Sequence, residues 1–268
     1  DRIAIISDKD EHIKYSDLDN ISTYLRSKIH RRSLVFSLNK NTLGSLSGYY
    51  SFLKNKVVPL MLDANIDYGL LESLMSTYSP EYLWLPKANV SKFPNGQEIC
   101  SVFDYTLIKF HNKNKFPLHK DLALLLGTSG STGSPKLVKL TYENIKSNAL
   151  SIIKYLSIDQ TERPITTLPM SYSFGLSIIN SHLYSGATLL LTNNSFFEKG
   201  FWTFLNSEKA TSLSGVPYTF EMLKKLRFFN MDIPSLTTIT QAGGKLNDEL
   251  NLEFAEYCKK TGKRFFVM

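Results

Sequence analysis

Residues 128–136 read Thr-Ser-Gly-Ser-Thr-Gly-Ser-Pro-Lys, and apolar segments flank them at Leu122–Leu126 and Leu137–Leu140. The glycines allow the backbone to turn its N–H groups toward an anion, the hydroxyls add hydrogen-bond donors, and Lys136 adds a positive charge. These are the properties of a loop that holds a triphosphate, carried here between two predicted strands. The same composition is also typical of a plain flexible linker.

The loop does not have the spacing of a Walker A motif, in which glycine directly precedes a lysine that is followed by serine or threonine and a helix. Here Ser134 and Pro135 separate the last glycine from Lys136, and Leu137 follows the lysine. Because the next residues alternate as a strand does, a P-loop NTPase or kinase is disfavoured. No Gly-x-Ser-x-Gly sequence occurs, which also disfavours a serine hydrolase.

Strand and helix signals alternate from end to end, which indicates an α/β protein. Strands predicted at 33–38 and 57–62 enclose a helical apolar stripe between Leu43 and Leu53, as in a βαβ unit. Near the start, Ser16 is expected to open a helix with Asp19 at the capping-box position. Further along, the predicted strands are 165–168, 187–192, 236–240 and 264–268, and the predicted helices are 142–156, 176–184, one begun by Pro217 and one capped by Asn247.

Composition limits the classes of function. The hydrophobic fraction of 43% and the aromatic fraction of 12% indicate a packed core, and no apolar run approaches the ~18 residues that cross a bilayer. Cys100 and Cys258 stand far apart and outside any Cys-x-x-Cys pair, which favours reduced thiols and a cytoplasmic location. The net charge of +7 is scattered and the histidines are dispersed, so we predict no nucleic-acid or membrane partner and no metal-ligand cluster.

The 128–136 stretch resembles the phosphate loop of the adenylate-forming (AMP-binding) superfamily, which includes acyl-CoA synthetases, luciferases and nonribosomal peptide adenylation domains. Every fixed position of the pattern Thr/Ser-Ser-Gly-Ser/Thr-Thr-Gly-x-Pro-Lys is matched, although Leu137 replaces the glycine that usually follows. Four more segments resemble the family in the expected order: YSDL at 15–18, LKNKVVPLMLD at 53–63, PMSYSFGL at 169–176 and AGGKL at 242–246.

The resemblance implies the N-terminal part of the adenylate-forming fold, without the C-terminal lid domain. That part consists of two α/β subdomains whose sheets are flanked by helices in an αβαβα layering. Residues 34–160 would form the subdomain with the phosphate loop. Residues 1–33 plus 161–268 would form the second subdomain, on the side of the adenine and the acyl group. The active cleft would lie between the phosphate loop and the edge near Gly243.

The resemblance also implies an activity. In the family, the carboxylate of an acid attacks the α-phosphate of ATP, pyrophosphate leaves, and the acyl group passes to coenzyme A or to the phosphopantetheine thiol of a carrier protein. Lys136 would be catalytic, because its charge offsets the charge that builds on the leaving group. The residues implied in ATP binding are Thr128, Ser129, Gly130, Ser131, Thr132, Gly133, Lys136, Gly243, Gly244 and Lys245.

The segment at 169–176 resembles the one that borders the acyl pocket, and the implied pocket residues are Tyr172, Ser173, Phe174 and Gly175. Tyr172 stands where many acyl-activating members have His and amino-acid-activating members have Asp. Because Tyr172 offers no charge to pair with an ammonium group, a free α-amino acid is a less expected substrate.

The family's Tyr-Gly-x-Thr-Glu motif, whose Glu binds Mg²⁺, is expected directly beyond Met268. We therefore expect that these 268 residues alone do not turn over. The competing hypothesis is a non-catalytic nucleotide-binding relative or scaffold. An intact acidic motif and a late lysine beyond Met268 would favour the enzyme.

Overall fold

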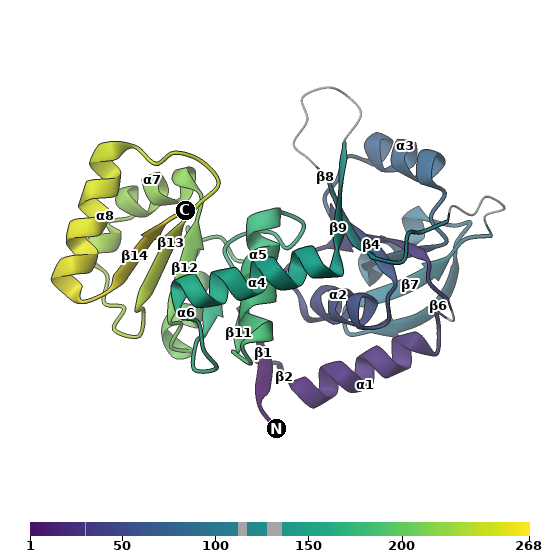
Figure 1. Cartoon of the computed structure of the whole chain (residues 1–268), viewed down its shortest axis with the longest axis horizontal. Coiled ribbons are helices and arrows are strands. Elements are labelled where there is room, and N and C mark those ends of the chain that lie inside the picture. Colours follow the sequence, from purple (N-terminus) through teal and green to yellow (C-terminus); the bar gives the residue numbers. More distant parts are fainter. Residues whose placement is uncertain (30, 112–116, 128–135) are drawn as a thin grey trace. The chain divides into compact units, whose positions relative to one another are not determined.

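The computed structural model describes residues 1–29, 31–111, 117–127 and 136–268. The chain divides into two compact units, each with its own sheet (Figure 1). The first unit comprises Asp1–Arg2, Ile13–Asn148 and Pro169–Ser173, and the second comprises Ile3–His12, Ala149–Leu168 and Phe174–Met268.

The first unit contains a seven-stranded mixed sheet with the strand order β6-β7-β5-β3-β4-β8-β9. The inner strands pair in parallel, whereas β6, β7 and β9 run antiparallel to their neighbours. The strands are β3 (Leu34–Asn39), β4 (Val58–Asp63), β5 (Tyr82–Pro86), β6 (Gln97–Val102), β7 (Tyr105–Lys109), β8 (Leu122–Gly127) and β9 (Leu137–Thr141). The helical elements are α1 (Tyr15–Arg26), α2 (Leu43–Lys54), α3 (Tyr68–Tyr78) and the 3-10 turn η1 (Lys87–Lys92).

Helices cover both faces of this sheet because its strands are apolar on both sides. Successive residues of β3 point in opposite directions: Val35 joins the cluster that includes residues of α1 and α2, and Phe36 joins the cluster that includes residues of α3. Figure 1 shows α3 on one side of the strands and α2 on the other.

Contact between α2 and β5 requires a glycine. A Cβ atom at Gly48 would lie 2.2 Å from Nε1 of Trp84, whose side chain is fully buried. The same Nε1 donates a hydrogen bond to the carbonyl oxygen of Gly44 at 3.1 Å. The tryptophan therefore locks the helix against the sheet at a distance that only glycine allows.

The second unit contains a seven-stranded sheet with the order β14-β13-β12-β10-β11-β1-β2, whose strands from β14 to β1 pair in parallel. Its strands are β1 (Ile3–Ser7), β2 (His12–Lys14), β10 (Pro164–Ile165), β11 (Leu189–Leu191), β12 (Ser212–Gly215), β13 (Thr238–Gln241) and β14 (Arg264–Val267). The helical elements around it are α5 (Ser173–Tyr184), α6 (Lys199–Ser207), α7 (Pro217–Lys225), α8 (Asp248–Thr261) and the 3-10 turn η2 (Phe228–Asn230). Helix α4 (Tyr142–Leu156) begins in the first unit and continues into the second from Ala149.

One face of the second sheet builds the larger core. Leu213 of β12 and Ile239 of β13 pack there with Phe201 of α6, Phe220 of α7 and Phe254 of α8. The opposite face is turned toward α5 and the end of α4. The predicted fold class is therefore confirmed: the chain is mixed α/β, with two sheets that are each flanked by helices.

Residues 13–29, which carry α1, group with the first compact unit. The physical reason is the contact between α1 and α2: Leu25 is buried beside Phe52, and Asp19 accepts a hydrogen bond from the Tyr50 hydroxyl at 2.6 Å. The division into a subdomain of residues 34–160 and a second subdomain of residues 1–33 plus 161–268 stays a prediction.

No helix in the described part of the chain is both long enough and apolar enough to cross a membrane.

We predict that Gly48→Ala lowers the free energy of unfolding by about 1–3 kcal/mol, because the new methyl group overlaps Trp84 and forces α2 away from the sheet. Gly69→Ala is the matched control. Gly69 lies in the first turn of α3, and its added Cβ would approach nothing closer than 3.4 Å, the distance to Oδ1 of Asp67. Urea unfolding should show the control neutral or stabilised by up to about 1 kcal/mol. Equal effects of the two substitutions would contradict the close approach of α2 to Trp84.

Candidate functional site

The predicted phosphate stretch connects two paired strands. Gly127 at the end of β8 stands opposite Leu137 at the start of β9, so residues 128–136 join the ends of an antiparallel pair. The predicted residues Thr128–Gly133 lie outside the described part of the chain. Lys136 is described: its side chain is exposed, and it comes directly before β9 in the first unit. The lysine thus precedes a strand, as the spacing predicted.

Arg32 supports the base of this strand pair, a role that sequence reasoning did not identify. Its guanidinium donates to the carbonyl oxygens of Lys56 and His119, at 2.7 Å in both cases, and to that of Leu122. It also lies 3.4 Å from the hydroxyl of Tyr142, the residue that follows β9. One side chain therefore joins the start of β8 to the residue after β9, and so fixes both ends of the segment that carries the loop.

The predicted adenine segment is an exposed glycine turn between β13 and α8. Gly243 has a φ of 82°, which side-chain-bearing residues rarely adopt. The turn is held from inside, because Nε2 of Gln241 donates to the carbonyl oxygen of Gly244 at 2.8 Å. The side chain of Asn247 then caps α8 by accepting from the backbone N–H of Leu250 at 3.3 Å. The backbone at 243–244 is thus exposed to solvent and carries no side chains, as contact with a flat ring such as adenine requires.

Lys245, the third predicted residue of this segment, points into solvent. Its Nζ lies 3.3 Å from Oδ1 of Asp248, and both side chains are more than 80% exposed, at 83% and 84%. A pair this exposed contributes little to stability. Contact of Lys245 with ATP stays a prediction.

The predicted acyl segment passes from one unit to the other. Tyr172, which is 39% exposed, and Ser173 belong to the first unit, whereas Phe174 and Gly175 belong to the second and are buried. Within the second unit, Phe174 lies in a cluster with Leu168 and Ile178, against which Ala242 packs. Because Ala242 directly precedes the glycine turn, the structure brings part of the predicted acyl segment beside the predicted adenine segment.

A cavity opens next to Phe174, between α5 and the sheet of the second unit. The space in it that is open to a water-sized group is about 20 Å³, room for about one water molecule. Phe174, Ser177 and Ile178 of α5 line one side, and four hydroxyl residues of β12 and β13 line the other: Ser212, Ser214, Thr238 and Thr240. The sequence prediction included Phe174 but missed all four hydroxyl residues. Their signal is the strict alternation Ser-Leu-Ser and Thr-Ile-Thr, which is unusual in a parallel strand covered on both faces.

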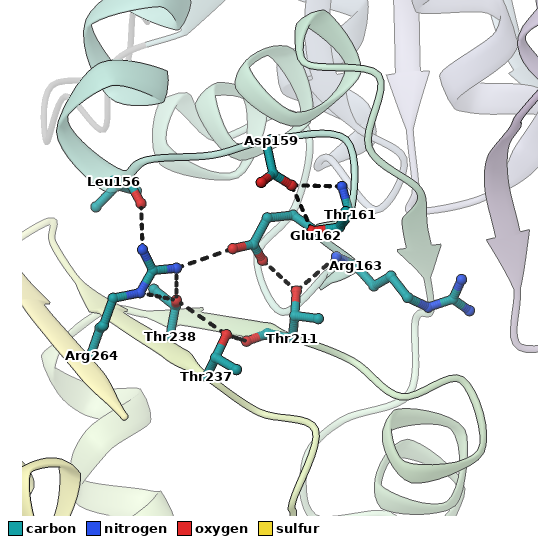
Figure 2. A network of polar contacts seen from close by, with 9 residues as sticks. All are labelled: Leu156, Asp159, Thr161, Glu162, Arg163, Thr211, Thr237, Thr238 and Arg264. Carbon is teal, nitrogen blue, oxygen red and sulfur yellow. Dashed lines mark hydrogen bonds and ion pairs between the residues drawn. The ribbon is translucent and has the colours of Figure 1, made fainter. Parts of the chain in front are cut away.

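A charged network borders this cavity (Figure 2). Nη2 of Arg264 lies 3.1 Å from Oε1 of Glu162, and the same nitrogen donates to the Thr238 hydroxyl at 2.6 Å. Oε2 of Glu162 accepts from the hydroxyl of Thr211, and Nη1 of Arg264 donates to the carbonyl oxygen of Leu156 at 3.1 Å. Because a buried carboxylate is costly unless it is paired and hydrogen-bonded, the arginine compensates the only carboxylate that lines the cavity among the described residues. The same contacts fix β14 to the end of α4.

His182 lines the cavity as a neutral imidazole. Its Nδ1 lies 2.8 Å from the carbonyl oxygen of Ile178, and that nitrogen therefore carries the proton, since a carbonyl oxygen only accepts. Burial lowers the pKa of His182 to about 4, because the charged form would be desolvated.

This pKa predicts a loss of stability in acid. The unfolded chain binds a proton near pH 6.5 and the folded chain only near pH 4, so the stability of the folded state falls as the pH drops through that window. Between pH 7 and pH 5 the loss attributable to His182 is about 2 kcal/mol. Denaturant unfolding of wild type and His182→Asn at both pH values measures it, because the two proteins differ only at this histidine. The same pH dependence in the two proteins would show that His182 is not buried neutral.

Among the described residues, no three His, Cys, Asp or Glu side chains converge in a way that could hold a metal ion.

The sequence profile of a known family, described as AMP-binding enzyme, matches residues 1–266. The chain belongs to the AMP-binding enzyme family. The predicted family membership is thus confirmed, and the match covers the glycine turn and the acyl segment as well as the 128–136 stretch.

Curated relatives of this AMP-binding chain include different activities. It is 30% identical over 149 residues to a luciferin 4-monooxygenase of Nipponoluciola cruciata, and this match spans 54% of the chain and 27% of the relative. It is 30% identical over 138 residues to a 2-succinylbenzoate–CoA ligase of Listeria innocua, spanning 52% of the chain and 28% of the relative. The matched region thus spans about a quarter of the length of these relatives.

Solved structures share the fold of the AMP-binding chain. An O-succinylbenzoate coenzyme A synthetase from Bacillus subtilis, solved in complex with AMP, superposes with a TM-score of 0.76 at 20% identity, over 100% of this chain and 56% of that one. A long-chain-fatty-acid–CoA ligase from Archaeoglobus fulgidus gives a TM-score of 0.79 at 16% identity, over 100% of this chain and 61% of that one. At these identities the likeness establishes the fold alone, and the predicted site residues stay predictions.

Proposed function

We propose that the protein containing this chain activates a carboxylic acid with ATP as acyl-AMP, releases pyrophosphate, and transfers the acyl group to the thiol of coenzyme A or of a carrier protein. The observation that carries the proposal is the packing of Ala242, in the second unit, against the cluster that contains Phe174. In a chain of the AMP-binding family, this packing brings the predicted acyl segment beside the exposed glycine turn.

The residues have separate tasks in this proposal. The loop at 128–133 and Lys136 would hold the phosphates of ATP, and Lys136 would offset charge on the departing pyrophosphate. The exposed backbone of Gly243 and Gly244 would lie against the adenine. Phe174 and Gly175, with Tyr172 and Ser173, would border the acid. Mg²⁺ would enter with the ATP, and the described residues offer no group of three or more acidic, His or Cys side chains to hold it.

Lys136→Ala in the full-length protein should lower kcat/KM for ATP roughly 10- to 100-fold, the effect of losing one charge-assisted contact of about 1.5–3 kcal/mol. Lys139→Ala is the matched control, because Lys139 is also an exposed lysine and lies three residues further along the chain, on β9. Steady-state kinetics with ATP as the varied substrate give both values. An unchanged kcat/KM in the Lys136 variant would remove this lysine from the mechanism.

The overall reaction is tested by ATP–pyrophosphate exchange in the full-length protein, using a panel of fatty, aryl, hydroxy and amino acids. Exchange that depends on one class of acid would support adenylation and name the substrate type. Absence of exchange with every class, in a protein that still binds ATP, would favour the non-catalytic nucleotide-binding relative instead.

A further inference from the structure

A fully buried glutamine stands directly before the glycine turn of the second unit. Gln241 is the last residue of β13, and none of its surface is exposed. Residues two apart in a strand point to the same side, so Gln241 follows Ile239 toward the apolar core. Glutamine is mostly found at protein surfaces, because a buried amide needs hydrogen bonds where water does not reach. Its presence at this position therefore needs a reason.

The side-chain amide of Gln241 is bonded to the turn that follows it. Its Nε2 donates to the carbonyl oxygen of Gly244 at 2.8 Å and to that of Ala242 at 3.3 Å. Because carbonyl oxygens only accept hydrogen bonds, the nitrogen and not the oxygen of the amide faces the turn. The oxygen, Oε1, is buried and has no hydrogen-bond partner among the described residues.

This half-used amide separates the donor of Gln241 from the rest of the side chain. A buried acceptor without a partner lowers stability. A methionine has the same length and would fill a similar volume without that cost, but it could not donate to the two carbonyl oxygens. The property that distinguishes glutamine here is thus the donor that holds Ala242 and Gly244.

The donor acts on a segment of backbone that has little else to define its shape. Gly243 and Gly244 are exposed and carry no side chains, and glycine backbone has access to many conformations. The N–H of Ala242 is fixed to the carbonyl oxygen of Gly215 at 3.2 Å, before the turn. Nε2 of Gln241 then bonds to the residues on both sides of Gly243, and so restricts the turn to one conformation.

We propose that Gln241 is a positioning residue for the nucleotide: by holding the carbonyl groups of Ala242 and Gly244, it keeps the exposed backbone of the turn in the shape that receives the adenine ring. Such pre-organisation raises affinity, because the turn is already ordered before the nucleotide binds. The inference rests on the proposed function, which sets the adenine against Gly243 and Gly244. It gives Gln241 no part in holding the phosphates, the task proposed for Lys136.

The test is the binding of two probes to the full-length protein, measured by titration calorimetry at pH 8. AMP carries the base, and inorganic tripolyphosphate carries phosphates alone. Gln241→Met should raise the Kd of AMP about tenfold, roughly the effect of one lost hydrogen bond, and should leave the Kd of tripolyphosphate unchanged. Lys136→Ala should give the opposite pattern. A purely structural role of Gln241 would not separate the two probes in this way.

Asn55→Leu is the matched control. Nδ2 of Asn55 also donates to a backbone carbonyl oxygen, that of Ser22 at 2.8 Å, but both residues belong to the first unit. This substitution should change neither Kd. Gln241→Glu is a second variant, which keeps the shape of the side chain and replaces the donor by an oxygen. It should weaken AMP binding at least as much as Gln241→Met, and it tests the inference if the methionine variant does not fold.

Three results would overturn the inference. The first is an unchanged Kd of AMP in the Gln241 variants, which would show that the turn keeps its shape without the donor. The second is an equal loss of affinity for AMP and tripolyphosphate in a folded variant, as general loosening of the unit would produce. The third is a wild type that does not bind AMP. Because AMP binding needs no acid, a protein without pyrophosphate exchange still gives this result, so failure of the proposed reaction is distinguishable from failure of this inference.

Discussion

The second unit depends on the in-register pairing of β12 with β13. This pairing sends Leu213 and Ile239 into the core against the aromatic side chains of α7 and α8, and it sends Ser212 and Thr238 to the opposite face. A shift of one residue would exchange the two faces, burying hydroxyls among phenylalanines and exposing leucine to the cavity. The register of this one strand pair therefore determines both which side chains pack in the core and which side chains line the cavity.

The same strands connect this face to the predicted nucleotide segment. β13 ends at Gln241, whose side chain organises the glycine turn through its bond to Gly244. On the other side of β13, Arg264 of β14 holds Thr238 and Glu162 together, so the polar wall of the cavity is braced from the sheet edge (Figure 2). One strand, β13, thus carries both part of the polar wall of the cavity and the residue that organises the predicted nucleotide turn.

Local signals in the sequence predicted much of the fold, and long-range contacts account for what they missed. The helices predicted to begin at Pro217 and after Asn247 do begin there, because N1 proline and an Asn cap act within one turn. The helix predicted to open at Ser16 with Asp19 begins at Tyr15 instead, and Asp17 accepts from the backbone N–H of Lys14 at 2.9 Å. The ion pair between Glu162 and Arg264, and the burial of Ser212 Oγ without a hydrogen-bond partner among the described residues, both depend on residues distant in the sequence. No local sequence pattern reveals them. The residues 128–133 of the candidate site lie outside the described chain and stay predictions.

The most direct test is a crystal structure of the full-length protein with AMP and the acid that best supports pyrophosphate exchange. The expected result is the adenine ring lying against the backbone of Gly243 and Gly244, with the acid bordered by the segment from Tyr172 to Gly175. A nucleotide bound away from the glycine turn, or an acid bound away from that segment, would contradict the proposed site of acid activation.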